Sequence, residues 1–481
     1  MIKNKSLDKA REEVRRIDFN TLKEEGIERT LENFYILGNY PPLMAMNSVD
    51  EDNLLRGNTQ KEFDIYLHFQ YCNQLCNFCH FYMDQRAKGA EDSRVVRYLD
   101  NLKTEISMLN ERIGGIRARS VYVGGGTPSF MSSKQIRDLF AHLYSEIDVP
   151  KGITITFDVH PEIVRGELHK LDTLVEVGVN RIAIGGVDLD DKVLQAQQRG
   201  HTSRELIELI QNLKLWGFPN IATDLIIGAP YQTPESWEKT VDTLVGDVCN
   251  IDCAMTFPHM FKASQPNWIG YQKDSMGFPS VEDRAVMQLL AMDKFDQAGY
   301  SHIPLYYFNR ESKYINDQQL RKFESLDESG LLAIGVSSFG FINGHQYFNI
   351  PNIQYYNSTV EERKLPVWMA AKLTPKNNFE RAVMFGLKSR GVKKKYIEEK
   401  YGYNVDDEYK SIIKRFEKLG LLISCPRELR LSRLGILFAE EICDYFAGDD
   451  VRERAEGKAL LTDPKDSMQR HNYNMIGHRL K

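Results

Sequence analysis

Residues 64–79 read DIYLHFQYCNQLCNFC, and this stretch decides the fold. Its first six residues form a short β-rich run, and a segment with three cysteines follows at once. Five similar runs follow, separated by longer segments of helical period: SVYVGG (120–125), ITITFDV (153–159), RIAIGG (181–186), IATDLIIG (221–228) and IDCAMTF (251–257). This alternation predicts βα units around a parallel sheet.

The segments between the runs are amphipathic. After the first run, apolar residues recur three or four apart at Val95, Leu99, Leu102, Ile106, Leu109 and Ile113, as on one face of a helix. A second helix is predicted around 168–175, and a third begins at a capping-box pattern formed by Thr202 and Glu205. Six such units are too few for a closed eightfold barrel, so we predict an α/β fold with an open, partial (β/α)6 TIM-like barrel.

The barrel accounts for only part of the 481 residues, since roughly 150 residues make one domain. The domain boundaries that we predict are an N-terminal extension over 1–60, the barrel over 61–300, a bridging or lid region over 301–372, a small winged-helix-like α+β accessory domain over 373–446 and a polar tail over 447–481.

Composition excludes several classes of protein. The net charge of -5 gives no global attraction to nucleic acid or to an anionic membrane. No apolar run approaches the roughly 20 residues that span a bilayer, and the charged N-terminus lacks the apolar core of a signal peptide, so we expect a cytoplasmic protein. Seven cysteines, an odd number with three crowded together, argue against a disulfide framework.

Cys72, Cys76 and Cys79 form a C-x3-C-x2-C motif on the predicted loop after the first strand. Three thiolates from one loop suit a [4Fe-4S] cluster that normally takes four, which leaves one iron open to another ligand. The alternatives are a structural zinc site with a distant fourth ligand, or buried thiols. Zinc ligands usually come in separated pairs, and the chain has no second C-x2-C.

The second predicted strand runs into Gly124-Gly125-Gly126-Thr127-Pro128. Glycines let the backbone approach a ligand closely, and ligands gather at the carboxyl ends of parallel strands. A plain tight turn is the alternative interpretation.

The cysteine motif followed one strand later by GGGTP resembles the radical S-adenosylmethionine (SAM) enzymes. The resemblance implies that the open iron binds the amino and carboxylate groups of SAM. An electron from the cluster then cleaves SAM to methionine and a 5'-deoxyadenosyl radical. A small-molecule substrate and an electron donor of the flavodoxin or ferredoxin type are also implied.

Further segments resemble one branch of this superfamily, the oxygen-independent coproporphyrinogen III oxidase-like family, which also contains a haem chaperone and several methyltransferases. They are Tyr66-x-His68, NRIAIGG (180–186), RGHT (199–202), TDLIIGAPYQT (223–233) and LSRLGILFAEEI (431–442). The resemblance covers roughly residues 60–445.

The resemblance implies roles for individual residues. Arg199 would pair with the SAM carboxylate, and Asp158 stands where the family has a SAM-binding Glu. The remaining implied cofactor contacts are Tyr66, Phe78, Gly125, Gly126, Thr127, Asp224 and Ile226. Asp158 and His160 are candidate catalytic residues, because they lie near the carboxyl end of a strand and can handle protons. The structural alternatives are a surface salt bridge for Arg199 and turn-capping roles for Asp224 and His160.

Three departures from the branch weaken the oxidase assignment: Phe81 replaces a further cysteine, Asp158 replaces Glu, and Val187 stands in place of Gln unless the second glycine shifts the register. The haem-binding segment of the chaperone begins His-Asn and ends Tyr-Trp, whereas this chain has Phe348-Asn349 and Tyr355-Tyr356. Elimination therefore favours methyl or methylene transfer from a second SAM. Porphyrinogen decarboxylation, anaerobic haem processing and haem chaperoning are the alternatives. A substrate with several carboxylates predicts Arg or Lys side chains inside the barrel.

Two other groups of residues invite a functional interpretation. Cys249 and Cys253 would lie about 13 Å apart in an extended chain, so we expect buried thiols rather than a second metal site. The segment that holds His345, Tyr347, Tyr355 and Tyr356 either lines a substrate pocket or packs between the barrel and the accessory domain.

Overall fold

The computed structural model describes residues 5–29, 38–49, 51–79, 84, 87–260, 266–273, 277–303, 305–311, 313 and 315–459. One mixed sheet dominates these residues, with thirteen strands in the order β1-β13-β12-β11-β10-β2-β3-β4-β5-β6-β7-β9-β8. Their bounds are β1 (Asn47–Ser48), β2 (Glu62–Phe69), β3 (Arg117–Gly125), β4 (Thr154–Val159), β5 (Arg181–Val187), β6 (Ile221–Ile227), β7 (Cys253–Pro258), β8 (Ser301–His302), β9 (Tyr307–Asn309), β10 (Leu331–Ile334), β11 (Phe339–Ile342), β12 (His345–Asn349) and β13 (Val367–Lys372).

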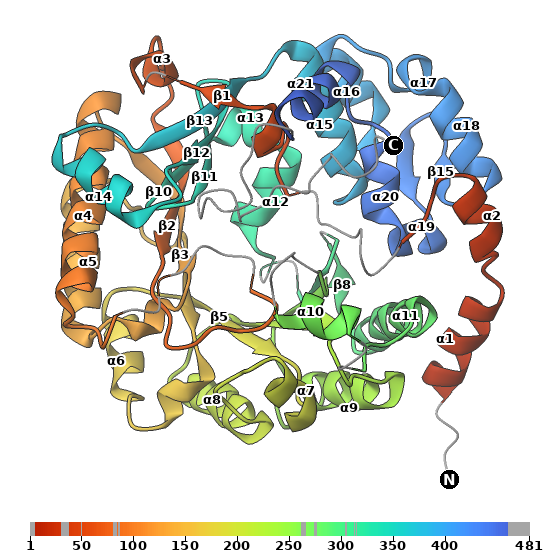
Figure 1. Ribbon diagram of the computed structural model, residues 1–481, viewed down its shortest axis with the longest axis horizontal. Coiled ribbons are helices and arrows are strands. Elements are labelled where there is room, and N and C mark those ends of the chain that lie inside the picture. Colours follow the sequence, from red (N-terminus) through yellow and green to blue (C-terminus); the bar gives the residue numbers. More distant parts are fainter. Residues whose placement is uncertain are drawn as a thin grey trace.

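The six predicted strands are confirmed as β2 to β7, and each pairs in parallel with the next. A seventh parallel strand, β10, pairs with β2 on its other side. Sequence patterning missed it because it is only four residues long and fully buried, so it has no alternation to read. The sheet curves into an open barrel with helices around its outside (Figure 1).

Long amphipathic helices cover the outer face. The helices up to residue 297 are α1 (Lys5–Arg15), α2 (Phe19–Glu24), α3 (Glu51–Leu55), α4 (Ser93–Ile113), α5 (Ser133–Glu146), α6 (His169–Glu176), α7 (Asp191–Ala196), α8 (Ser203–Leu215), α9 (Pro234–Val245), α10 (Pro266–Gln272) and α11 (Val281–Gln297). Leu99, Leu102 and Ile106 on α4 are buried, as their spacing predicts. The capping box of Thr202 and Glu205 is present at the start of α8.

Residues 301–372, the predicted bridging or lid region, add strands to the main sheet. Beyond β10, the strands β11, β12 and β13 are antiparallel and carry the sheet on to β1. The helices of this region are α12 (Asp317–Glu324), α13 (Leu326–Ser329) and α14 (Ile353–Glu361). This region therefore forms one wall of the barrel.

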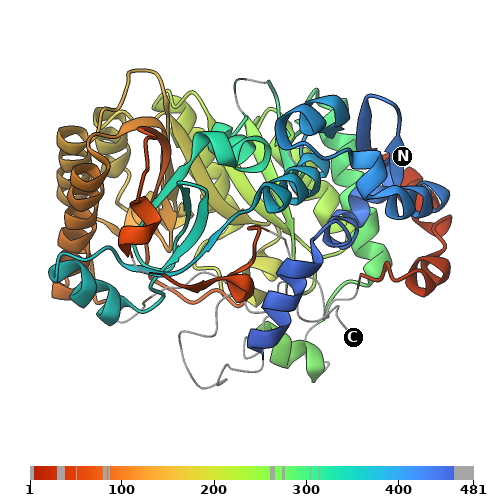
Figure 2. The same ribbon diagram turned by 90° about the horizontal axis from the view of Figure 1, so that it is seen from above.

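The C-terminal part contains a hairpin, β15 (Leu422–Ser424) with β16 (Glu428–Leu431), and a third strand, β14 (Val392–Lys393), that pairs with β16. Its helices are α15 (Pro375–Leu387), α16 (Lys394–Tyr401), α17 (Val405–Glu408), α18 (Lys410–Lys418), α19 (Arg433–Leu437), α20 (Ala439–Asp444) and α21 (Asp449–Ala459). This part and the helices α1 and α2 lie together on the side of the barrel opposite α4 and α5 (Figures 1 and 2).

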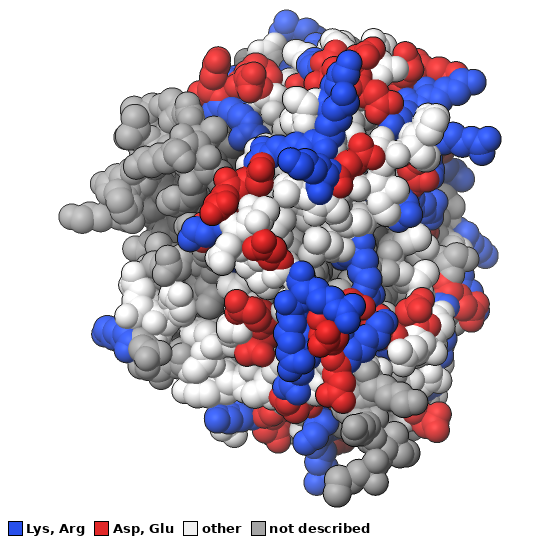
Figure 3. All heavy atoms as spheres, turned by 90° about the vertical axis from the view of Figure 1, so that its right-hand side faces the viewer, with Lys and Arg blue, Asp and Glu red and all other residues white. Residues whose placement is uncertain are grey.

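Ion pairs join the N-terminal helices to their neighbours on this side. Arg433 pairs with Glu13 at 2.9 Å, and Arg415 pairs with Glu25 at 2.9 Å. Basic and acidic side chains are interspersed over the face (Figure 3), so it offers no broad basic surface to a polyanion. None of the described helices is long and apolar enough to cross a membrane.

Candidate active site

The loop that leaves β2 carries the three cysteines at the carboxyl end of the parallel strands. Cys72 and Cys76 are buried, and Cys79 is partly exposed. The Cys72 sulfur lies 3.1 Å from the hydroxyl of Thr127, and Nη1 of Arg199 donates to the Cys76 sulfur at 3.1 Å. Burial raises the pKa of the Cys72 thiol to about 11, against the opposing effect of the Thr127 hydrogen bond.

Among the described residues, no three His, Cys, Asp or Glu side chains converge closely enough to hold one metal ion. In a [4Fe-4S] cluster each thiolate binds a different iron, so the three sulfurs need not meet at one point. A loop with two buried cysteines beside a guanidinium therefore fits a cluster better than a single zinc ion.

Polar side chains fix the conformation of the cysteine loop. The backbone N–H of Asn77 donates to the carbonyl of Gln197 at 3.1 Å, and its side-chain amide donates to the carbonyl of Ala196 at 2.8 Å. The amide nitrogen of Gln74 lies 2.9 Å from Nε2 of His160. The loop is thus tied to the segments that follow β4 and β5.

The glycines at the end of β3 lie so close to other backbone atoms that no larger residue would fit at their positions. Gly125 has φ +113°, and a Cβ atom there would lie 2.7 Å from the carbonyl oxygen of Phe69. A Cβ atom on Gly126 would lie 2.7 Å from the carbonyl oxygen of Tyr71. The GGGTP segment is therefore packed against the backbone that leads into the cysteine loop. This contact requires glycine at both positions, whereas a plain turn would require it only where φ is positive.

Asp158 and Asp224 lie on β4 and β6. The hydroxyl of Tyr122 donates to Asp158 at 2.8 Å. Burial raises the pKa of both carboxyl groups to about 7, and the charge of Asp224 contributes to the shift at Asp158. Oδ1 of Asp224 is buried with no hydrogen-bond partner in the described part of the chain. Asp224 lies within β6, so the alternative of a turn cap is wrong.

Arg199 is held from two sides. Its Nη2 donates to the carbonyl of Gly185, and Nη1 donates to Cys76. Its Nε is buried with no partner, and Arg199 forms no ion pair with any described residue, so the surface salt bridge is wrong. One donor of this guanidinium is left for a ligand that enters the site.

His160 caps the short turn that begins at Pro161, because its Nδ1 accepts from the backbone N–H of Glu162 at 3.3 Å. Its ring lies 5.3 Å from the ring of His201, between ring centres. Burial holds the pKa of His160 well below its ordinary value, so the ring is neutral at pH 7. His160 therefore has a structural role as a turn cap, and its catalytic role stays a prediction.

The other predicted cofactor contacts surround the same region. The hydroxyl of Tyr66 lies 3.1 Å from Nδ1 of His68. Ile226 lies two residues beyond Asp224 on β6 and is partly exposed, and Phe78 is partly exposed on the cysteine loop. Phe81 lies outside the described residues.

Two residues that sequence reasoning did not single out also belong here. Tyr122 precedes Gly124 by two positions on β3, so both residues face the same side of the sheet. This alternation could have indicated from the sequence that Tyr122 lies on the side of the GGGTP segment. Arg181 is fully buried at the start of β5, with Nη2 at 4.0 Å from the sulfur of Cys253 and with Nε and Nη1 lacking partners in the described regions. The signal for Arg181 in the sequence was a charged residue at the start of an otherwise apolar strand.

The extra glycine of β5 forms a bulge. Ile184 pairs with Thr223 and Val187 with Leu225, so three residues on β5 span two on β6. The ladder is therefore irregular at the second glycine, as the register-shift alternative requires, and the next residue with a polar side chain is Asp188. Asp188 is fully buried and accepts from Gln232 and Thr240, each at 2.6 Å.

The groups that invited other interpretations are structural. Cys249 and Cys253 are fully buried thiols, as expected. Tyr347 donates to the carbonyl of Ala333 and Tyr356 to Glu105, both inside the protein. Only Tyr355 is well exposed in this set, at 60%, so three of the four residues favour packing over a pocket.

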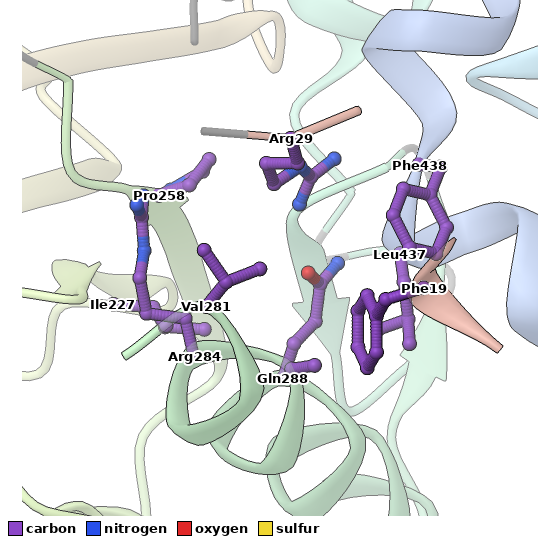
Figure 4. Close-up of a pocket in the computed structure, with 10 residues that line it drawn as sticks. Phe19, Arg29, Ile227, Pro258, Val281, Arg284, Gln288, Leu437 and Phe438 are labelled. Atoms are coloured by element: carbon purple, nitrogen blue, oxygen red, sulfur yellow. The ribbon is translucent and has the colours of Figure 1, made fainter. Parts of the chain in front are cut away.

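Arg29 and Arg284 line a small cavity near the ends of β6 and β7 (Figure 4). Arg29 binds Glu441 through two hydrogen bonds of 2.9 and 3.2 Å, and Arg284 donates to the carbonyl of His259 at 2.9 Å. The cavity volume of about 20 Å³ holds about one water molecule. These arginines tie the N-terminal segment to the barrel and the C-terminal helices.

The residues around the cysteine loop fit the cofactors that the sequence predicts. Two cysteine sulfurs already receive or share hydrogen bonds, the glycines pack the GGGTP segment against the start of the cysteine loop, and Arg199 and Asp224 keep an unused donor and an unused acceptor. Such a donor and acceptor suit a cofactor that carries both a carboxylate and hydroxyl or amino groups.

Comparison with known proteins agrees with this geometry. Residues 66–244 match the model of the radical SAM superfamily. The heme chaperone HemW of Bacillus subtilis is 25% identical over 396 residues, which cover 80% of this chain and 99% of HemW. The oxygen-independent coproporphyrinogen III oxidase of Salmonella typhimurium is 25% identical over 402 residues, which cover 80% of this chain and 86% of the oxidase.

The fold also matches a solved structure, that of coproporphyrinogen III oxidase (HemN) from Escherichia coli. The TM-score is 0.74 at 23% sequence identity, over 90% of this chain and 99% of that chain. The predicted α/β fold with an open barrel of parallel strands is therefore confirmed.

Proposed function

Since residues 66–244 of this chain form a radical SAM domain, we propose that the protein is an enzyme that cleaves SAM reductively and acts on a tetrapyrrole. The observation that carries the proposal is the contact of Arg199 with Cys76 at the end of the barrel, where the GGGTP segment also packs against the cysteine loop. That arrangement brings an expected cluster ligand and an expected SAM contact to one point.

Cys72, Cys76 and Cys79 would hold a [4Fe-4S] cluster, which supplies the electron that breaks a carbon–sulfur bond of SAM. Arg199 offers its free Nε donor to the SAM carboxylate, and Asp224 offers its free oxygen to a hydroxyl group. Tyr122 orients Asp158 through their 2.8 Å hydrogen bond. The protein's part is to position these groups and to exclude water.

The names of the relatives support a tetrapyrrole as the substrate. A substrate with several carboxylates predicts a cluster of Arg or Lys side chains inside the barrel. Arg181 on β5 is one buried cation there, with Nη2 at 4.0 Å from the Cys253 sulfur, and the cluster itself stays a prediction. The prediction of methyl or methylene transfer from a second SAM gains no support from these relatives. It remains an outcome that the experiment below detects.

Haem chaperoning is the second candidate, because HemW is matched over 99% of its length. The segment that would bind haem argues for the enzyme instead. Phe348 and Asn349 are each 1% exposed on β12, and the side chain of Asn349 donates to Glu105 at 3.1 Å. Tyr356 is fully buried and donates to the same Glu105. These side chains are engaged inside the protein and are not available as haem ligands.

The test is anaerobic turnover of the reconstituted full chain with dithionite and SAM, with coproporphyrinogen III or haem added separately. We expect more 5'-deoxyadenosine in the presence of one of the two, with a matching mass change in that tetrapyrrole. Cys76→Ser is the control and should form neither product. S-adenosylhomocysteine in step with a methylated product would replace the proposal by methyl transfer. Tight haem binding without SAM cleavage would replace it by chaperoning.

A further inference from the structure

Two of the three expected cluster ligands receive hydrogen bonds from the segments expected to bind SAM. Thr127 belongs to the GGGTP segment, and its hydroxyl lies 3.1 Å from the Cys72 sulfur. Arg199 follows α7, and its Nη1 lies 3.1 Å from the Cys76 sulfur. The two contacts come from different strand units, 72 residues apart in the chain by their numbers.

Both donors are fixed by their own backbone and side-chain contacts. The backbone N–H of Thr127 donates to the carbonyl of Tyr71 at 2.9 Å, which places the threonine beside the start of the cysteine loop. Nη2 of Arg199 donates to the carbonyl of Gly185. A Cβ atom on Gly185 would come within 3.3 Å of that nitrogen, so the glycine gives the guanidinium its place. Neither donor relies on the cluster for its position.

We propose that Thr127 and Arg199 set the reduction potential of the cluster, in addition to any contact that they make with SAM. The inference rests on the proposed function, since it requires the three cysteines to hold a cluster. Hydrogen bonds to the cysteine sulfurs are one of the factors that set the potential of an iron–sulfur cluster. Because the reduced cluster carries one more negative charge, a donor at a ligand sulfur stabilises it more than the oxidised cluster.

The chemistry is a one-electron transfer with no bond made or broken. The cluster accepts an electron from a low-potential donor of the flavodoxin or ferredoxin type, or from dithionite in the laboratory. Arg199 has the larger effect, because its guanidinium adds a positive charge to the hydrogen bond. Thr127 contributes a neutral hydroxyl, whose effect is smaller.

The test measures the potential of the reconstituted full chain in the absence of SAM. Arg199→Met removes the donor and the charge, Arg199→Lys keeps the charge, and Thr127→Val removes only the hydroxyl. Arg137→Met is the matched control, because it removes a guanidinium that pairs with Glu176 on the outer helices and contacts no cysteine. Iron content and the visible spectrum establish that each variant carries a full cluster, and the reduced fraction is followed by electron paramagnetic resonance.

At a fixed potential we expect the ratio of oxidised to reduced cluster to rise at least tenfold in Arg199→Met, which is about 59 mV for one electron. A rise of about threefold is expected in Thr127→Val, with Thr127→Ser and Arg137→Met unchanged. If Arg199→Met fails to assemble a cluster, Thr127→Val decides the matter. If Arg199→Met and Thr127→Val carry full clusters that titrate at the wild-type potential, the inference is overturned and the proposed function is not. If the wild-type chain assembles no cluster, the proposed function itself is overturned.

Discussion

Two carboxyl groups in this protein reach a similar raised pKa in opposite surroundings. Burial raises the pKa of Glu105, on α4 outside the sheet, and of Asp224, on β6, to about 7. Glu105 accepts from the Tyr356 hydroxyl at 2.5 Å, from the Gly335 N–H at 2.9 Å and from Asn349 at 3.1 Å. Oδ1 of Asp224 has no partner within the described ranges.

The difference separates a structural carboxylate from one prepared for a ligand. Three protein donors compensate the burial of Glu105 and join α4 to the loop after β10. Only the nearby charges of Arg181 and Arg199 offset the burial of Asp224, and its Oδ1 lacks a hydrogen bond, which is costly unless a bound molecule supplies the missing donor. The predictions below test that contrast.

The largest effect is expected for Glu105→Ala. The substitution leaves a buried hydroxyl, an N–H and an amide without their acceptor, so the free energy of unfolding should fall by about 4 kcal/mol. Urea denaturation measures the change. Glu105→Gln, which keeps the shape, should lose less. A loss below about 1 kcal/mol in Glu105→Ala would show that these hydrogen bonds do not hold the wall of the barrel.

Asp224→Asn should show the reverse pattern. Its stability should stay within about 1 kcal/mol of the wild type, because the carboxylate has no protein donor to lose at Oδ1. Formation of 5'-deoxyadenosine should fall about a hundredfold, since the acceptor for the cofactor is weakened. The two assays are run on the same preparation. Normal SAM cleavage in this variant would remove Asp224 from the site.

The stability of the wild type should depend on pH through Asp224. Its pKa is about 7 in the folded protein against an ordinary value of 3.8, so the folded protein retains a proton that the unfolded chain has released. The contribution of this group is therefore most favourable below about pH 4 and is lost as the pH rises to about 7.

Asp224→Asn lacks this dependence, so its stability relative to the wild type should improve by on the order of 1–2 kcal/mol between pH 5 and pH 7.5. Asp138→Asn is the control, because Asp138 is an exposed partner of Lys134. Urea denaturation at four pH values makes the measurement. An unchanged difference across this range would mean that Asp224 is not titrating there.

The smallest effect is expected for Tyr122→Phe, which removes one hydrogen bond to Asp158. Stability should fall by about 1 kcal/mol. The Tyr122 hydrogen bond lowers the pKa of Asp158, so its loss should raise that pKa further and move the pH dependence of SAM cleavage upward. Rates measured from pH 6 to pH 9 test this, and an unshifted profile would separate Asp158 from the reaction.

Local patterns account for what the sequence predicted of the fold. The strands β2 to β7 carry continuous or alternating apolar residues, and the capping box of α8 lies within four residues. The strands β10 to β12 were missed, because they are four or five residues long and fully or largely buried. The pairing of β10 with β2 also joins segments more than 260 residues apart.

The candidate site divides in the same way. The cysteine spacing and the glycines are local, so they were readable. The contact of Arg199 with Cys76 joins residues 123 positions apart, and the bulge between Ile184 and Val187 depends on pairing with β6. Tyr122 reaches Asp158 across neighbouring strands. Such contacts depend on tertiary register, which no local pattern encodes.

The most direct test of the central claim is SAM cleavage by the anaerobically reconstituted full chain with dithionite, with 5'-deoxyadenosine and S-adenosylhomocysteine measured by mass spectrometry in one sample. We predict 5'-deoxyadenosine from the wild type, no S-adenosylhomocysteine, and neither compound from Cys76→Ser. A wild-type chain that carries a full [4Fe-4S] cluster and forms no 5'-deoxyadenosine would contradict the assignment of Cys72, Cys76 and Cys79 to a catalytic radical SAM site.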